Sequence, residues 1–364
     1  MSERNLRFRK VLIFTLLSVL NFIFLLARLQ PALQIRLGQS REIGRDKDTF
    51  GSIVSACEDA RGNFYVLDRI EHRVLKFSSE GRPLLVFGQK GQGPGDFQSP
   101  GRIAFSSQGE LVVLEDLYYV SFFTTEGVFL KRLDLNGRLG LGYVGPDSFY
   151  GWIWRPEDKQ QVILDGRNTI VRSLHTVSKD EFSVSVSEPG GRAVMFNYGP
   201  EAYASSFLFD HSASLSALAV SRVYHVILLD DTGREVASIR RDLKPPRLNK
   251  KERQFFERDI QETTKSKGWP SRVSREMIRK IPDFKNPISD VRLSREHVFV
   301  FRFSPDVTAA GSSIPVDIFT LRGEFLGSAE LPDIPLLIGQ ESMYFVRSEE
   351  SGLVFLEKMA YRLE

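Results

Sequence analysis

Cysteine, histidine and net charge are scarce in this sequence. The 364 residues include one Cys and five His, so the chain can form neither an internal disulfide nor a cysteine-based zinc site. The formal net charge is only +3, and the first ten residues account for it, because four basic residues stand there against Glu3. The remainder is neutral overall, unlike a dedicated nucleic-acid binder, so we predict no nucleic-acid partner. Cys57 lies in a strand-like run, where we expect a buried, inert thiol.

Catalytic and cofactor-binding motifs are also absent. The chain has no Gly-x-Ser-x-Gly elbow, and no two of its His stand at a metal-ligand spacing. The glycine-rich run from Gly88 to Gly95 lacks the Gly-Lys-Ser/Thr ending of a phosphate loop. We therefore predict no catalytic residue, no cofactor and no metal, and we favour a binding protein over an enzyme.

The composition that is present is typical of a folded, strand-rich protein. Hydrophobic residues make up 42% of the chain and charged residues 26%, so it can bury a core and global disorder is excluded. The 28 Phe are an unusually high number, and Phe and Val in short runs favour strands over helices.

Residues 11–27 form a hydrophobic run, VLIFTLLSVLNFIFLLA, behind a basic flank. As a helix it would span about 25 Å at ~1.5 Å per residue, slightly short of a ~30 Å hydrocarbon core. A cleaved signal peptide needs small residues before the cut, and Gln30-Pro31-Ala32 fits that need poorly. We therefore predict that residues 1–32 are an uncleaved signal-anchor with a single transmembrane helix. Secretion after cleavage is the alternative.

The orientation of this segment is less strongly marked than its hydrophobicity. Basic residues lie on both of its flanks, so the positive-inside bias is modest. A signal-like segment normally delivers the chain on its C-terminal side across the membrane. We therefore expect the N-terminus in a bacterial cytoplasm and the rest of the chain in the periplasm or another extracytoplasmic space.

Two stretches of the body repeat one pattern. Phe50 to Gly88 aligns with Phe97 to Leu135, such that Gly62 corresponds to Gly109. Each stretch reads as four short apolar strands separated by Gly turns, which is the spacing of a β-propeller blade. The expected strands are 53–57, 64–67, 74–77 and 84–87 in the first stretch, and 103–105, 111–114, 120–123 and 129–133 in the second.

The linker between these stretches, GQKGQGPGDFQSPGRIAF (Gly88 to Phe105), resembles the signature of NHL repeats. The resemblance covers residues 33–135, and the whole chain also resembles exported bacterial six-bladed propellers of uncharacterised role. It implies an all-β six-bladed β-propeller over residues 33–364. Some propellers with related repeats are lactonases or amidating lyases, which gather metal ligands at the channel mouth.

Looser strand patterns supply the other blades. We expect blade three at 139–177, blade four at 205–242, blade five at 288–331 and blade six from Pro335, with a loop at 180–204. The stretch Gln34 to Gly44 looks like a fourth strand plus linker and has no first three strands of its own. We expect it to close the last blade and remove an exposed edge.

Residues 245–287 interrupt the strand pattern, and we predict a helical insertion there. Leu248, Phe255, Phe256 and Ile260 recur at helical spacing, and a second short helix is expected over 271–281. From Lys250 to Lys285 there are 11 basic and 6 acidic residues. We hypothesise a docking surface for an acidic partner or anionic lipid, against the alternative of a solvated cap on the ring. Its candidate residues are Lys250, Lys251, Arg253 and Arg258.

A second candidate site lies at equivalent positions of the two repeats. Asp68-Arg69 and Glu115-Asp116 each come just past the second strand. If they line one end of the channel, they form a charged rim that could bind a polar ligand. The alternative is that they cap loops and pair with neighbouring blades.

The function we predict is a membrane-tethered binding or scaffolding propeller on the exported side. Residues 11–27 would anchor it in the membrane, and it would bind a protein partner. A small-molecule ligand is a further possibility. The alternatives are a metal-dependent periplasmic hydrolase or lyase of the propeller type, and an accessory subunit of a larger membrane complex. The sequence names neither ligand nor pathway nor oligomeric state.

Overall fold

We describe the protein from a computed structural model. It describes residues 33–364 except 46–48, 116–118, 135–139, 146–147, 155–157, 166, 168, 179–182, 188–192, 198–205, 213, 305, 307 and 309–310. The predicted signal-anchor, residues 1–32, lies outside the described part of the chain. Within that part, no helix combines the length and hydropathy that a membrane crossing requires.

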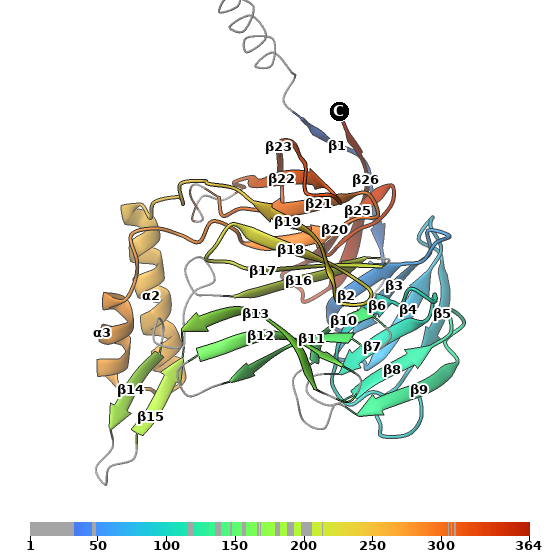
Figure 1. Ribbon diagram of the computed structural model, residues 1–364, viewed down its shortest axis with the longest axis horizontal. Coiled ribbons are helices and arrows are strands. Elements are labelled where there is room, and N and C mark those ends of the chain that lie inside the picture. Colours follow the sequence, from blue (N-terminus) through green and yellow to red (C-terminus); the bar gives the residue numbers. More distant parts are fainter. Residues whose placement is uncertain are drawn as a thin grey trace, which may run out of the picture.

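The described residues form an all-β ring of six four-stranded antiparallel sheets, a six-bladed β-propeller (Figure 1). Blade one contains β2 (Ile53–Glu58), β3 (Phe64–Asp68), β4 (Arg73–Phe77) and β5 (Pro83–Phe87). Blade two contains β6 (Pro100–Phe105), β7 (Leu111–Glu115), β8 (Tyr119–Phe123) and β9 (Phe129–Asp134). Blade three contains β10 (Gly140–Gly145), β11 (Ser148–Trp154), β12 (Asp158–Asp165) and β13 (Ile170–Ser178).

The second half of the ring repeats this order. Blade four contains β16 (Phe207–Ser212), β17 (Leu215–Val220), β18 (His225–Asp230) and β19 (Glu235–Arg240). Blade five contains β20 (Asp290–Leu293), β21 (His297–Phe301), β22 (Ile314–Thr320) and β23 (Phe325–Leu331). Blade six contains β24 (Leu337–Ile338), β25 (Ser342–Ser348), β26 (Val354–Leu363) and, as its outer strand, β1 (Ile35–Ile43).

The two ends of the described chain share blade six. β1 pairs antiparallel with β26, from Ile35 opposite Leu363 to Ile43 opposite Leu356. The last strand therefore gains a partner from the other end of the chain, so its edge is not left open. Figure 1 shows β1 and the C-terminus side by side.

Burial follows the strand order within each blade. All five residues of β3 and of β7 are buried, because these second strands have neighbours on both edges and blades on both faces. The outer strands alternate instead: Leu84 and Val86 of β5 are about half exposed. A run of apolar residues thus marks an inner strand, and a mixed run marks an outer one.

The glycines of the linkers explain how one blade leads to the next. Gly44 and Gly88 have positive φ angles of 72° and 87°. A Cβ on either would stand 2.2 Å from the ring of Phe50 or Phe97, respectively. Only Gly fits at such a position, because it accepts positive φ and has no side chain to meet the ring. Both Phe are buried, so each linker is fixed at the start of its blade.

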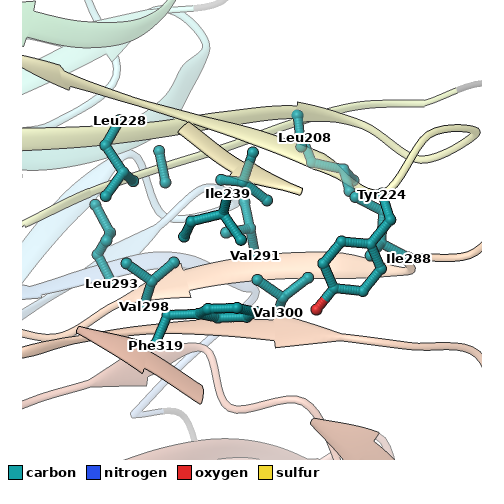
Figure 2. Packing of buried hydrophobic residues seen from close by; sticks show 13 residues of the cluster. Leu208, Tyr224, Leu228, Ile239, Ile288, Val291, Leu293, Val298, Val300 and Phe319 are labelled. Carbon is teal, nitrogen blue, oxygen red and sulfur yellow. The ribbon is translucent and has the colours of Figure 1, made fainter. Parts of the chain in front are cut away.

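Neighbouring blades are held together by apolar side chains that interlock between their faces (Figure 2). Each buried aliphatic or aromatic residue contributes roughly 1.5–3 kcal/mol relative to an exposed one. At one edge of this cluster the Tyr224 hydroxyl donates a 2.6 Å hydrogen bond to Asp317. The cluster in Figure 2 joins blade four to blade five and includes Leu208, Leu228, Ile239, Val291, Val298 and Phe319.

The predicted insertion contains two helices, α2 (Lys250–Ser266) and α3 (Ser271–Arg279), which lie at one side of the ring (Figure 1). Asn249 and Glu252 form a capping box at the start of α2. Lys285 and Glu252 are fully buried and form an ion pair of 2.5 Å between Nζ and Oε1. Lys285 also donates to the carbonyl of Ser304 in blade five's long loop, so this pair ties the insertion to the ring.

The prediction of a loop at 180–204 is wrong in one respect, because these residues contain a β-hairpin. β14 (Ser183–Ser187) pairs with β15 (Ala193–Asn197) over five residues, and β14 contacts α3. The alternating sequence SVSVS and the intervening Pro189-Gly190-Gly191 are strand and turn signals. The hairpin adds no strand to any blade, so the count of six is unaffected.

Candidate functional site

The ring has two different faces. In each blade whose linker and turns the structure describes, the linker that enters the first strand and the turn between the second and third strands share one face, here called the linker face. The turn between the first and second strands and the turn between the third and fourth share the other, here called the first-turn face. The first strands line the axis, where β2 contacts β6 and β16 contacts β20.

The predicted rim residues Asp68 and Glu115 belong to the linker face and lie inside the protein. Asp68 is fully buried, and its two carboxylate oxygens accept 2.9 Å hydrogen bonds from the backbone N–H groups of Gly51 and Ser52. Glu115 is 3% exposed and accepts from the N–H of Gln98 at 2.6 Å. Each carboxylate therefore holds the linker that enters its own blade.

Of the other two predicted rim residues, the structure describes only Arg69. Arg69 is exposed, and its guanidinium reaches the hydroxyl of Ser99 at 3.5 Å. Asp116 lies outside the described residues. The structure thus places Asp68 and Glu115 in matching positions of two blades without bringing their carboxylates to a common cavity.

The candidate docking residues of the insertion share α2. Lys250, Lys251 and Arg258 are exposed. Arg253 is half-buried, and it donates to Asp283 and to the carbonyl of Pro282, both at 3.1 Å. Arg253 therefore fastens the end of the insertion to α2, while the other three cations face solvent.

A cavity of about 470 Å³ opens on the first-turn face. Its walls come from four blades that are far apart in sequence. Blade one contributes Glu58 to Arg61, Asn63 and Lys76, blade two contributes Phe105 to Ser107, Gly109 and the turn at Thr125 and Glu126, blade four contributes Ser212 and Ser214, and blade five contributes Arg295. A volume of this size is typical of a small-molecule site.

Two acidic residues lie at the cavity wall, Glu58 as the last residue of β2 and Asp59 directly after it. Glu58 accepts a 3.0 Å hydrogen bond from the backbone N–H of Gln340 in blade six. Burial raises the pKa of Glu58, and the nearby charges of Arg295 and Lys358 oppose that rise. Asp59 accepts from the N–H groups of Arg61 at 2.8 Å and Asn63 at 2.9 Å, which fixes the turn.

The side of the cavity between blades one and two is rigid. Lys76 donates to the carbonyl of Thr125 at 2.8 Å and lies 5.2 Å from the ring centre of Tyr65. The Tyr65 hydroxyl donates to the same carbonyl at 3.1 Å. Burial raises the pKa of Tyr65, and the charge of Asp59 adds to that rise. These contacts join the two blades at the cavity floor.

Deeper along the axis, charged side chains narrow the channel to a small cavity of about 80 Å³. Arg102 donates to the carbonyl of Phe209 at 3.0 Å, and its guanidinium lies 5.2 Å from that ring's centre. Asp210 accepts from the N–H of Leu293 at 2.7 Å. Burial lowers the pKa of Arg102 and raises that of Asp210. These contacts hold blades two, four and five to one another inside the ring.

Histidines form a second polar cluster away from the cavity. The Nε2 of His175 lies 3.2 Å from the Nδ1 of His225, and the Nδ1 of His175 lies 2.7 Å from the amide oxygen of Gln161. Since that oxygen only accepts, His175 donates from Nδ1. Burial lowers the pKa of His225 to about 4. Among the described residues, no group of three or more His, Cys, Asp or Glu could hold a metal ion.

Sequence reasoning missed the cavity because it compared the ends of the second strands. Asp68 lies opposite Ile53 at one end of the β2–β3 hairpin, and Glu58 lies opposite Phe64 at the other. The available signal was the pair of equivalent first turns, Asp59 to Asn63 and Ser106 to Glu110. No such similarity pointed to Arg295, because blades four and five were placed by strand pattern alone.

Comparison with known proteins defines the fold and nothing finer. No protein-family model matches the chain, and no curated protein matches it. The structure of a DUF4221 family member from Bacteroides vulgatus is 11% identical, with a TM-score of 0.52 over 92% of this chain and 99% of that one. A protein described as exported, from Bacteroides fragilis, is 11% identical, with a TM-score of 0.51 over 90% of this chain and 95% of that one.

An enzyme is also among the solved structures that match. Virginiamycin B lyase from Staphylococcus aureus is 8% identical, with a TM-score of 0.40 over 90% of this chain and 99% of that one. Similarity at this level carries no argument about activity. The two Bacteroides structures are the ones that support the six-bladed propeller-like fold of this chain.

Proposed function

We propose that this protein is a membrane-tethered propeller that binds a small ligand on the exported side, in the cavity of the first-turn face. The observation that carries the proposal is that one cavity of about 470 Å³ gathers side chains from four separate blades. Function in a propeller resides in such a site rather than in the fold. Because blades one, two, four and five all contribute to its walls, the site exists only when the ring is assembled.

The membrane part of the proposal rests on the sequence. Residues 11–27 are apolar and follow a basic flank, which is the pattern of a signal-anchor. The Bacteroides fragilis neighbour is described as exported, in line with this location. We also propose that the blades are NHL-type repeats, since the equivalent linkers with Gly44 and Gly88 pack against Phe50 and Phe97 in the same way.

A single labelling experiment tests export and occupancy together. The one native thiol, Cys57, is buried, so an introduced cysteine can be labelled selectively. Ser214→Cys places a thiol at the cavity, and Ser351→Cys places one in an exposed turn of blade six on the linker face. A membrane-impermeant maleimide should label both variants in intact cells. Labelling at 214 relative to 351 should be slower in cells than in purified protein, because bound ligand covers the cavity.

Two results would contradict the proposal. If both thiols react only after the cells are permeabilised, the ring is not exported. If the ratio of the two labelling rates is the same in cells and in purified protein, the cavity is not the occupied site. Cys57 alone, in the unaltered chain, provides the background rate.

The helical insertion is the surface that we propose for a protein partner. Lys250, Lys251 and Arg258 are exposed on α2, and Phe255 beside them is 48% exposed. Exposed cations around an aromatic side chain suit an acidic partner. Reversing the three charges to Glu should release proteins that co-purify from membranes while the ring stays folded. Unchanged co-purification would exclude this surface.

A further inference from the structure

The polar side chains of the cavity divide into those that form hydrogen bonds within the protein and those that remain available to a ligand. The carboxylates belong to the first group. Glu58 accepts from the Gln340 N–H, and Asp59 closes its own turn. Glu126 accepts a 2.6 Å hydrogen bond from the hydroxyl of Thr125, which lowers the pKa of Glu126. These three acids have partners without any ligand.

The guanidinium groups of Arg61 and Arg295 differ from those acids. Within the described part of the chain, neither side chain makes a hydrogen bond or a close ion pair. Arg295 is half-buried, and its charge acts on Glu58, whose pKa it lowers. A partly buried Arg that makes no hydrogen bond to the described residues keeps its N–H donors free for an incoming acceptor.

Both cations stand on turns whose backbone is fixed. The hydroxyl of Ser294 accepts from the N–H of His297 at 3.0 Å, and the Ser294 N–H donates to the His297 carbonyl at 2.9 Å. Arg295 lies at the tip of the turn that these bonds close. Arg61 sits in the turn held by Asp59. Fixed turns limit the entropy lost when these side chains bind a ligand.

The charge of the whole cavity restricts what its cations can bind. Its lining carries three basic side chains, on Arg61, Lys76 and Arg295, and three acidic ones, on Glu58, Asp59 and Glu126. A ligand with several negative charges would face these acids at close range, whereas a single charge can pair with one guanidinium. A guanidinium fork matches a carboxylate through two parallel hydrogen bonds.

Hydroxyl groups supply the rest of the polar lining. Ser107, Ser212 and Ser214 line the cavity, and no hydrogen bond of their hydroxyls is found among the described residues. Phe105 at the wall offers an apolar surface beside them. Serine hydroxyls both donate and accept, so they suit hydroxyl groups on a ligand.

We propose that this cavity binds a small, singly charged carboxylic acid that carries hydroxyl groups, with its carboxylate on Arg295. The proposal rests on the proposed function and adds the chemical class of the ligand. Arg295 supplies the paired hydrogen bonds, Arg61 adds positive charge at the opening, and the serines bind the hydroxyls.

Three sugars of matched size test the class of ligand. D-glucuronate carries one carboxylate, glucose is neutral, and glucose 6-phosphate carries a phosphate. Titration calorimetry on the full chain in detergent should show glucuronate binding at least about tenfold more tightly than glucose, since a charge-assisted hydrogen bond of roughly 1.5–3 kcal/mol is lost without the carboxylate. Glucuronate should also bind more tightly than glucose 6-phosphate, because the additional negative charge of the phosphate faces the three acidic side chains of the lining.

Variants locate the binding to Arg295. Arg295→Ala should weaken glucuronate binding by about tenfold or more and leave the weak binding of glucose unchanged. Arg295→Lys should fall between them, because an ammonium keeps the charge and loses the fork. Arg322→Ala is the matched control, because Arg322 is an exposed residue of another blade-five turn on the same face and does not line the cavity.

Each contrary result has its own meaning. Equal binding of glucose and glucuronate would overturn the acidic ligand, and tighter binding of glucose 6-phosphate would replace the carboxylate by a phosphate. Binding that survives Arg295→Ala would move the site elsewhere, and no binding of any sugar would overturn the ligand class. If the thiol at 214 is still protected in cells, the cavity remains a binding site and only the ligand class fails.

Discussion

The acidic residues on the two faces of the ring differ in what surrounds them, although on both faces they accept hydrogen bonds from backbone N–H groups. On the linker face, Asp68 and Glu115 are buried and bind the backbone N–H groups of the linkers. On the first-turn face, Glu58 stands in an open cavity beside Arg295, where burial raises its pKa. The first pair are part of the fold, since removing them would leave buried donors unsatisfied. Glu58, in contrast, borders a cavity that no described side chain of the fold fills.

The comparison teaches how to separate structural from functional polar residues in a repeat protein. Asp68 and Glu115 attract attention because they recur at equivalent positions. Recurrence in this case reflects a requirement that blades one and two share, namely to hold the incoming linker. The cavity residues do not recur: Arg61, Ser107 and Arg295 all lie in first turns, but the side chains that these turns bring to the cavity differ between blades. A site for one ligand breaks the symmetry of the ring.

The largest expected effect is a loss of stability when the buried carboxylate of Asp68 on the linker face is removed. Asp68→Ala removes the acceptor for the N–H groups of Gly51 and Ser52 and leaves Arg73, 3.7 Å away, without its ion-pair partner. We expect the free energy of unfolding to fall by about 3 kcal/mol, since buried hydrogen bonds to a charged group are lost. Urea unfolding of the full chain in detergent measures this.

The control for that variant lies on the same loop. Glu71 is exposed, so Glu71→Ala should change the free energy of unfolding by no more than about 0.5 kcal/mol. Glucuronate affinity should be the same for both variants at temperatures where they are folded. An Asp68→Ala protein of normal stability with impaired glucuronate binding would place Asp68 in the ligand site and reverse the comparison.

Much of the fold could be predicted because the sequences of blades one and two align residue by residue. The strands expected at 64–67 and 111–114 match β3 and β7 to within one residue. The insertion was also found, since Phe256 and Ile260 recur at helical spacing and are buried on one side of α2. Period alone separates such a helix from strands.

The cavity could not be predicted in the same way. Its walls join Glu58 to Arg295, which become neighbours only when the ring assembles and the first turns of blades one and five face each other. Sequence periodicity gives the order of strands within a blade and contains no information on which turns meet across the axis. The hairpin at β14–β15 was missed for a simpler reason, because it lies outside the blade pattern.

An intermediate effect is expected from the contact between blades six and one at the cavity. A Cβ on Gly339 would stand 2.1 Å from Oε2 of Glu58 and 3.3 Å from the carbonyl oxygen of Ser342. Gly339→Ala must therefore move the Glu58 carboxylate, and we expect a loss of about 1 kcal/mol in the free energy of unfolding.

A double variant identifies the cause. In Gly339→Ala/Glu58→Ala the new methyl group meets no carboxylate, so the double variant should lose less stability than the two single changes added together. The measurement is a double-mutant cycle by urea unfolding. Additive effects would show that Gly339 and Glu58 do not constrain each other, and the cavity wall would then be less fixed than the contacts between blades indicate.

The smallest expected effect is a shift in melting temperature, whose direction should differ between neutral variants of Glu58 and Asp68. The pKa of Glu58 is raised above its ordinary value of 4.5, chiefly by burial, so the folded state binds its proton more readily than the unfolded state does. The penalty for holding the charged form is absent below that ordinary value and grows as the pH rises through the folded-state pKa. Glu58→Gln should therefore raise the melting temperature slightly at pH 7, and the gain should vanish near pH 4.

Asp68→Asn should lower the melting temperature at pH 7, because an amide replaces one acceptor by a donor beside the linker N–H groups. If both neutral variants shift the melting temperature in the same direction, the two faces do not use their acids differently.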